Sequence, residues 1–296
     1  MAAAAIGDGK GGGVRTMPLV APSVVLLLIF SLVPLALTIF YSLYRYNLLY
    51  PERYGFYGLR NYFYLFQNPN LWIALRITLQ LVVEVLALTL IVGTVTAALF
   101  ETRFAGRGFA RVLMISPFFV MPTVAAVVWK NLFMSPVNGI FAWIAGLFGL
   151  GPIDMLGHWP LTSVVMIVAW EWTPFAFLIL VTALQSLDDS ALEAAKIDGA
   201  GPIAVFFNIQ LPHLGRAIGV VTMIETIFLL SIFAEIAITT SGGPGVSSSN
   251  LTFLISQRLA NANDVGGASA MGVVAIILAN VVAAILIRIV AKRLDV

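Results

Sequence analysis

The sequence predicts an all-α fold, a polytopic membrane bundle of six transmembrane helices. Only 30 of the 296 residues are charged (16 Lys and Arg, 14 Asp and Glu) and 60% are hydrophobic, against about 25% and about 45–50% in ordinary soluble proteins. A soluble domain of this length must cover a large surface with groups that water can solvate, and so few charges cannot do that. In addition, six apolar stretches each reach the roughly 20 residues that a helix needs to cross a bilayer core.

These six stretches follow a short glycine-rich segment, residues 1–17, for which we expect a flexible cytoplasmic tail. Each stretch is too long for a strand of a membrane barrel, which needs about 9–11 residues, so helices are expected. The remaining chain, 18–296, forms one transmembrane domain. The expected spans are approximately 19–43, 74–100, 109–133, 161–184, 217–239 and 270–290.

Several classes of protein are disfavoured by what the sequence lacks. Without cysteine there is no disulfide framework, thiolate metal site or cysteine nucleophile. The sequence has no His-Glu-x-x-His pair, no Gly-x-Ser-x-Gly elbow and no Gly-x-x-x-x-Gly-Lys-Ser/Thr loop. The basic residues form no long patch of the kind that binds nucleic acid. We therefore expect neither an intramembrane enzyme nor a nucleic-acid partner, and no cofactor or metal bound by this chain.

The distribution of Lys and Arg predicts the orientation in the membrane. Six spans place both termini and the second and fourth connections on one side, which carries ten basic residues against six on the other. The bias favours cytoplasmic termini. It is weakened by four arginines in the first connection, Arg45 to Arg76, where many aromatic residues indicate a segment lying at the headgroups.

The connection between the fourth and fifth spans, residues 186–213, has the pattern of two short helices outside the membrane. Asp189 or Ser190 is a candidate N-cap, good helix formers follow, and Gly199 stands where the first helix should end. A second segment begins at Pro202. The pattern fits either a compact knob that another protein grips or an ordinary interfacial linker.

This connection resembles the EAA motif of ABC-importer permeases at every fixed position. The matching residues are Glu193, Ala194, Ala195, Gly199, Ile209, Leu211 and Pro212. The resemblance implies that the motif forms coupling helices that dock on a cytoplasmic ATP-binding subunit. ATP and Mg would then be bound by that separate subunit and not by this chain.

A second signature narrows the resemblance. Thr239-Thr-Ser-Gly-Gly-Pro-Gly245, followed by Asn250-Leu-Thr252, is similar to the Thr-x-Gly-Gly-Pro signature of MalF-like carbohydrate permeases. That family implies a multi-pass protein of the bacterial cytoplasmic (inner) membrane. Its partners would be a second, MalG-like permease subunit, two copies of the ATP-binding subunit and a periplasmic or lipid-anchored solute-binding protein. The segment 264–269 and the span behind it look most like permeases for sorbitol, mannitol and related polyols.

Four carboxylates lie within the predicted spans: Glu84, Glu171, Glu225 and Glu235. An acid inside the membrane is costly, and it usually faces a cavity or a partner. Carboxylates accept hydrogen bonds from sugar hydroxyls and aromatic rings pack on C–H faces. The candidate solute path therefore consists of Trp170, Glu171, Trp172, Glu225 and Glu84. In the alternative interpretation the acids bond neighbouring helices or the partner permease, and the tryptophans are ordinary packing.

The same charges suggest the kind of solute. Since the middle of the predicted spans contains acids but no Lys or Arg, we expect a neutral carbohydrate, a sugar alcohol or a small sugar, moved by alternating access. A cation such as a polyamine would also suit acids without bases. An ion-coupled secondary transporter is the remaining alternative, although the sequence shows no evident internal repeat of the kind common in such carriers.

Overall fold

The computed structural model describes residues 17–102 and 104–294, and the expected tail lies outside this part except for Met17. The described chain is mostly helical. Four helices are long and apolar enough to cross a membrane: α1 (Met17–Ser42), α3 (Pro69–Glu101), α8 (Pro160–Leu184) and α15 (Val265–Leu294). Counting each of two bent helix pairs as one span raises the number to as many as six.

The stretch predicted as a span at 109–133 is not one continuous helix but a bent pair, which counts as one candidate span if its two parts are taken together. It consists of α4 (Arg107–Ile115), a 3-10 turn, α5 (Pro122–Val128) and a π-helical turn, with a bend of 105° between residues 107–119 and 122–133. Pro117 and Pro122 explain the break, because proline lacks the N–H that a continuing helix needs and clashes with the preceding turn.

The stretch predicted at 217–239 is also divided, into α12 (Gly215–Leu229) and α13 (Ala234–Thr239). No glycine or proline lies in the break. Instead, two side chains from a later segment donate hydrogen bonds to backbone carbonyls in the break. The Asn250 amide donates to the carbonyl of Ile232, and the Thr252 hydroxyl donates to the carbonyl of Leu230. These bonds provide donors for carbonyl oxygens that would accept backbone N–H groups in a continuous helix.

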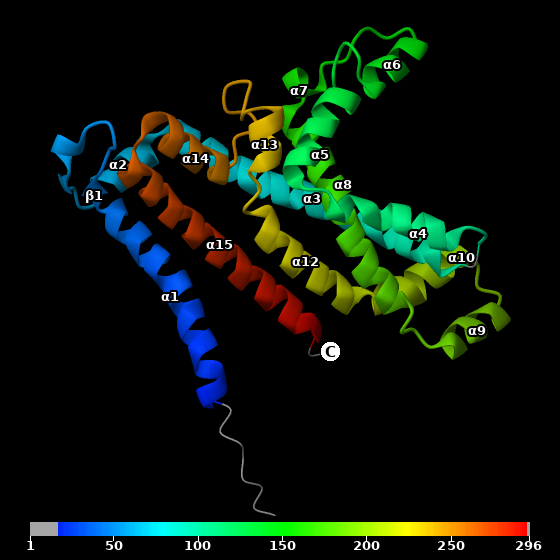
Figure 1. Cartoon of the computed structure of the whole chain (residues 1–296). Helices are drawn as coiled ribbons and strands as arrows, with labels where there is room; N and C mark the ends of the chain where they lie inside the picture. Colours follow the sequence, from blue (N-terminus) through cyan, green and yellow to red (C-terminus); the bar gives the residue numbers. More distant parts are fainter. Residues whose placement is uncertain (1–16, 103, 295–296) are drawn as a thin grey trace, which may run out of the picture.

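The centre of the bundle is the pair α3 and α8, with α12 packed against both. Two groups of buried apolar residues lie along this pair. One includes Val85, Val168, Leu229 and Ile236, and the other includes Ala97, Phe177, Leu180 and Leu214. Of the long helices, α8 has the largest buried share, and it crosses α3 near the middle of the molecule (Figure 1).

Shorter elements close the two ends of the bundle. One end carries β1 (Tyr44–Arg45) and β2 (Gly55–Phe56), which pair antiparallel, and the helices α2 (Arg60–Gln67) and α14 (Leu251–Ala262). The opposite end carries α9 (Asp189–Ile197) and α10 (Pro202–Val205) (Figure 1). Two further short helices, α6 (Ile140–Leu147) and α7 (Met155–His158), precede α8.

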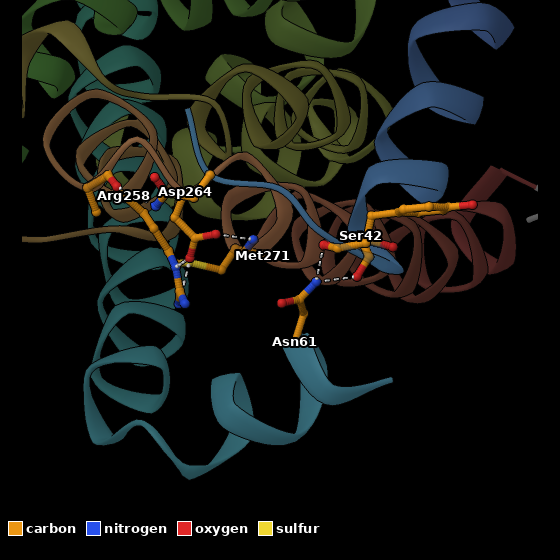
Figure 2. A network of polar contacts seen from close by, with 9 residues as sticks. Ser42, Asn61, Arg258, Asp264 and Met271 are labelled. Carbon is orange, nitrogen blue, oxygen red and sulfur yellow. Dashed lines mark hydrogen bonds and ion pairs between the residues drawn. The ribbon is translucent and has the colours of Figure 1, made fainter. Parts of the chain in front are cut away.

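A polar knot at the α2 end consists of two neighbouring groups of contacts, one at the end of α1 and one at the start of α15 (Figure 2). Asn61 donates to the carbonyls of Ser42 and Tyr44 at 2.8 and 2.9 Å. Nearby, Arg258 forms an ion pair of 2.8 Å with Asp264, which also accepts the backbone N–H of Gly267 at the start of α15. The bonds of Asn61 hold the end of α1 against α2, and those of Asp264 hold the start of α15 against α14.

Candidate functional site

The connection 186–213 is helical on both sides of a turn. It contains α9, α10, a π-helical turn (Phe206–Gln210) and α11 (Leu211–His213). The residue that caps α9 is Asp188, not Asp189 or Ser190 as the sequence suggested, because its carboxylate accepts both the N–H and the hydroxyl of Ser190, at 3.0 and 2.7 Å. These hydrogen bonds lower the pKa of Asp188 below its usual 3.8.

Gly199 makes the turn that ends α9. Its φ is +76°, a left-handed conformation that glycine adopts without the steric cost paid by other residues. The N–H groups of Asp198 and Ala200 close the helix on the carbonyls of Ala194 and Ala195, both at 2.9 Å. The turn therefore redirects the chain within three residues into the second helical segment.

Both ends of this connection are attached to the central helices. Nε2 of His213 lies 3.0 Å from the carbonyl oxygen of Ala183 near the end of α8 and 3.3 Å from the hydroxyl of Ser186. The Gln210 amide donates to the carboxylate of Glu101 at the end of α3. The second half of the connection is therefore bonded to the ends of α3 and α8.

The connection presents small and apolar side chains to its surroundings. Glu193 and Ala194 are exposed and Ala195 is half-buried. The apolar side chains of Ile197, Ile203 and Phe207 are 86%, 74% and 58% exposed. A groove of about 1030 Å³ runs between this connection and the end of α3. Of the remaining motif residues, Ile209 and Leu211 are half-buried and Pro212 is exposed.

Three of the four intramembrane acids are buried between helices. Glu225 is fully buried, and one of its oxygens accepts the Thr89 hydroxyl of α3 at 2.7 Å. Glu171 on α8 and Glu235 on α13 are 6% and 2% exposed, and their carboxyl groups interact electrostatically. Neither Glu171 oxygen accepts a hydrogen bond from a donor in the described residues, and the two acids can bond each other only when one carries a proton.

The residues expected to form one solute path are not brought together. Successive helix residues point about 100° apart, so Trp170, Glu171 and Trp172 face different neighbours. Trp170 packs edge-on against Trp129 at 5.8 Å between ring centroids, whereas Trp172 packs against Phe228 at 5.1 Å. Glu84 is half-buried and accepts the amide of Gln80 on its own helix at 2.7 Å.

A groove that the sequence reasoning missed lies between α12, α14 and α15. It has a volume of about 450 Å³, and its lining includes none of the four acids. Its polar lining residues are neutral: Thr78, Thr226, Ser231, Thr252 and Asn280. Hydroxyl and amide groups within otherwise apolar spans are the sequence signal that could have indicated it.

A helical membrane bundle that has an attached two-helix knob at one end, and between its spans a mostly apolar groove with a few neutral polar groups, has the features of a permease subunit. A model of the family described as "Binding-protein-dependent transport system inner membrane component" matches residues 89–296. The chain belongs to this family, whose members are permease subunits of ABC transporters with a separate ATPase, so it is a transport subunit and not an enzyme.

Known proteins of the same kind are similar over nearly the whole chain. The trehalose/maltose transport system permease protein MalF of Thermococcus litoralis is 30% identical over 88% of both chains. The sn-glycerol-3-phosphate transport system permease protein UgpA of Escherichia coli is 31% identical over 93% of both. A chain of a bacterial ABC transporter that imports the acidic polysaccharide alginate shares the fold, with a TM-score of 0.79 over 94% of this chain and 96% of that one, at 20% identity.

Proposed function

We propose that this chain is one half of the membrane pore of an ABC importer for a neutral carbohydrate, and that residues 186–213 couple it to the ATPase. The observation that carries the proposal is the construction of this connection. It exposes Ile197 and Ile203 on one side and is attached to α3 and α8 through Gln210 and His213 on the other. An exposed apolar surface outside the spans indicates a protein partner.

The remaining partners follow from the same proposal. The chain would pair with a second, MalG-like permease and contact one of two copies of the ATP-binding subunit. A periplasmic or lipid-anchored binding protein would deliver the solute. The solved alginate transporter was obtained in complex with its periplasmic protein, which supports the last partner. Both termini would be cytoplasmic, on the side of α9.

In this mechanism closure of the ATPase pair displaces α9. The left-handed turn at Gly199 holds α9 at a fixed angle to α10, so the two move together. The bonds of Gln210 and His213 then pass the movement to the ends of α3 and α8. The spans separate on the outer side to receive solute and return when ATP is hydrolysed, which is alternating access between two states.

The chemistry of the groove between α12 and α15 supports the proposal that the solute is uncharged. Its hydroxyl and amide groups can donate to and accept from sugar hydroxyls without a countercharge. Among the similar proteins, MalF is named for trehalose and maltose, but UgpA for a phosphorylated glycerol. We propose a sugar alcohol or small sugar for this chain, in line with the polyol-like segment at 264–269.

An uptake assay with the assembled importer tests the solute class. We expect ATP-dependent uptake of labelled sorbitol, mannitol or maltose, and none of sn-glycerol-3-phosphate or putrescine. Asn280→Ala should lower this uptake at least tenfold, because it removes a donor and an acceptor from the groove, whereas Asn131→Ala, outside it, should not. Uptake of the phosphorylated or cationic solute alone would contradict the neutral-carbohydrate proposal.

Co-purification tests the coupling role. Ile203→Asp places a charge on the exposed surface of the connection and should reduce recovery of the ATP-binding subunit. Val137→Asp changes an equally exposed apolar residue in the loop before α6 and should not. Equal recovery of the subunit with both variants, together with normal solute-stimulated ATP hydrolysis, would show that the ATPase docks elsewhere.

The orientation can be tested with single cysteines, since the natural chain has none. We expect a cysteine at Ser190 to react with an impermeant thiol reagent only from the cytoplasmic side, and one at Gln67 only from the outside. The reverse pattern would contradict cytoplasmic termini.

A further inference from the structure

The segment between α1 and α3 presents an apolar stripe that no other part of the described chain covers. Leu59, Phe63 and Phe66 are spaced four and three residues apart, so they share one face of α2. All three are exposed, Leu59 by 70% and Phe63 by 60%. Trp72 in the first turn of α3 extends the stripe, because its indole N–H donates to the carbonyl of Phe66 at 3.1 Å.

The opposite face of α2 is fixed to the protein. Leu65 is buried in a cluster with Leu71, Leu251 and Met271, and Tyr62 packs against that cluster. Asn61 on the same side bonds the carbonyls of Ser42 and Tyr44 (Figure 2). The helix is therefore held in one orientation, with its stripe of larger apolar side chains turned away from the core.

Positive charge gathers beside this stripe without matching acids. Residues 44–68 contain Arg45, Arg53 and Arg60 but only one acid, Glu52. The guanidinium groups of Arg45 and Arg60 both lie against the ring of Tyr57, 5.9 and 5.5 Å from its centroid. In the described residues neither of these two arginines has an ion-pair partner. Two guanidinium groups at one ring form a place for an anion that accepts several hydrogen bonds.

The position of the segment indicates which anion this is. The segment connects the end of α1 at Ser42 with the start of α3 at Pro69, and both of these helices are candidate membrane spans. The stripe and the arginines therefore lie where a span meets the membrane surface, at the end opposite α9 (Figure 1). Tryptophan, tyrosine and arginine are suited to this depth, because their apolar parts enter the acyl region and their polar ends reach headgroups.

We propose that the stripe of Leu59, Phe63, Phe66 and Trp72 inserts into the outer leaflet, and that Arg45 and Arg60 bind the phosphate groups of anionic phospholipids there. The helix α2 then acts as a surface anchor that holds the junction of α1 and α3 at a fixed depth. The site takes a lipid phosphate as its ligand and the acyl chain region as its apolar contact.

Fluorescence of Trp72 in the assembled importer tests this proposal. The importer is placed in two kinds of phosphatidylcholine nanodisc. One contains brominated phosphatidylglycerol and the other contains the same fraction of brominated phosphatidylcholine, with the bromine near the headgroup in both. The difference between the natural chain and Trp72→Phe isolates the signal of Trp72 from the other five tryptophans. We expect this signal to be quenched by both lipids, and more strongly by brominated phosphatidylglycerol.

Removing the charges should remove the preference. In Arg45→Gln/Arg60→Gln the enrichment of anionic lipid at Trp72 should fall roughly fivefold for each arginine. Arg216→Gln, an exposed arginine at the other end of the bundle, is the matched control and should keep the preference. If the double variant does not assemble, raising the salt concentration with the natural chain should reduce the enrichment instead.

Three results would overturn the proposal. An unquenched Trp72 would mean that a protein partner, the second permease or the binding protein, covers the stripe. Equal quenching by the two brominated lipids would remove the anionic preference. A preference that persists both in the double variant and at high salt would place the anionic lipid at other residues.

Discussion

The hydroxyl of Thr89 on α3 donates a 2.7 Å hydrogen bond to the carboxyl of Glu225 on α12, and both side chains are buried. The bond joins residues that are 136 positions apart in the sequence. The other carboxyl oxygen of Glu225 has no partner among the described residues. This acid therefore takes part in a contact between α3 and α12 in the single chain.

Removal of this hydroxyl should loosen the contact between α3 and α12. We expect Thr89→Val to lower the free energy of unfolding by about 1–2 kcal/mol, because it removes a donor to a buried acid and leaves the shape unchanged. The measurement is thermal unfolding in detergent. Thr96→Val is the control, since the Thr96 hydroxyl bonds only carbonyls of its own helix; equal losses in the two variants would contradict the role of the interhelical bond.

At Gly199 there is room for a side chain, but the backbone conformation is unfavourable for any residue other than glycine. A Cβ at this position would meet nothing within 4 Å, yet a φ of +76° costs other residues about 1–2 kcal/mol. We expect Gly199→Ala to reduce solute uptake per ATP hydrolysed while the subunits still co-purify. Gly201→Ala, at a φ of −71° and with similar space, should leave coupling normal, and the backbone explanation fails if both variants behave alike.

The polar knot at the α2 end should be sensitive to a single methyl group. A Cβ on Gly267 would lie 2.2 Å from an Asp264 oxygen and 2.4 Å from Nε of Arg258. We expect Gly267→Ala to break this ion pair and to destabilise the protein by about 1–3 kcal/mol. Thermal unfolding measures the loss, and Gly146→Ala, with nothing within 4 Å, is the control. An unchanged unfolding temperature for Gly267→Ala would mean that the knot is not close-packed.

The cap of α9 makes a prediction about pH. Because the Ser190 bonds lower the pKa of Asp188, the cap contributes stability above the ordinary value of 3.8, and this contribution is lost as the pH falls through the lowered pKa. We expect Ser190→Ala to raise the pKa of Asp188 toward its usual value, measured by NMR of labelled aspartate. Ser186→Ala should not change it; an unaltered titration in Ser190→Ala would contradict the cap.

Glu171 remains the acid to test for a role in transport. It is buried beside Glu235 without a donor from the described chain. We expect Glu171→Ala to impair uptake while the importer still assembles, and Glu84→Ala, whose carboxyl bonds Gln80 on the same helix, to have the smaller effect. Uptake with unchanged rate and affinity in Glu171→Ala would remove this acid from the solute path.

The sequence was sufficient for the class of protein and for the general place of the spans. Apolar length decides whether a helix can cross a membrane, and α1, α3, α8 and α15 lie where the apolar stretches indicated. The family followed from a motif in which residue type and spacing are both informative. The break near Leu230 could not be predicted from local patterns, since it goes with bonds from Asn250 and Thr252, which no local window contains.

By itself the sequence determined that this chain is a helical permease component, because composition and motif depend on residues near one another. Only the tertiary structure decided what each intramembrane polar group faces. Glu171, Trp170 and Trp172 are neighbours in sequence but diverge around a helix, while Glu171 and Glu235 meet from separate helices. Helix rotation and packing set these directions, and both depend on contacts between segments that lie far apart along the chain.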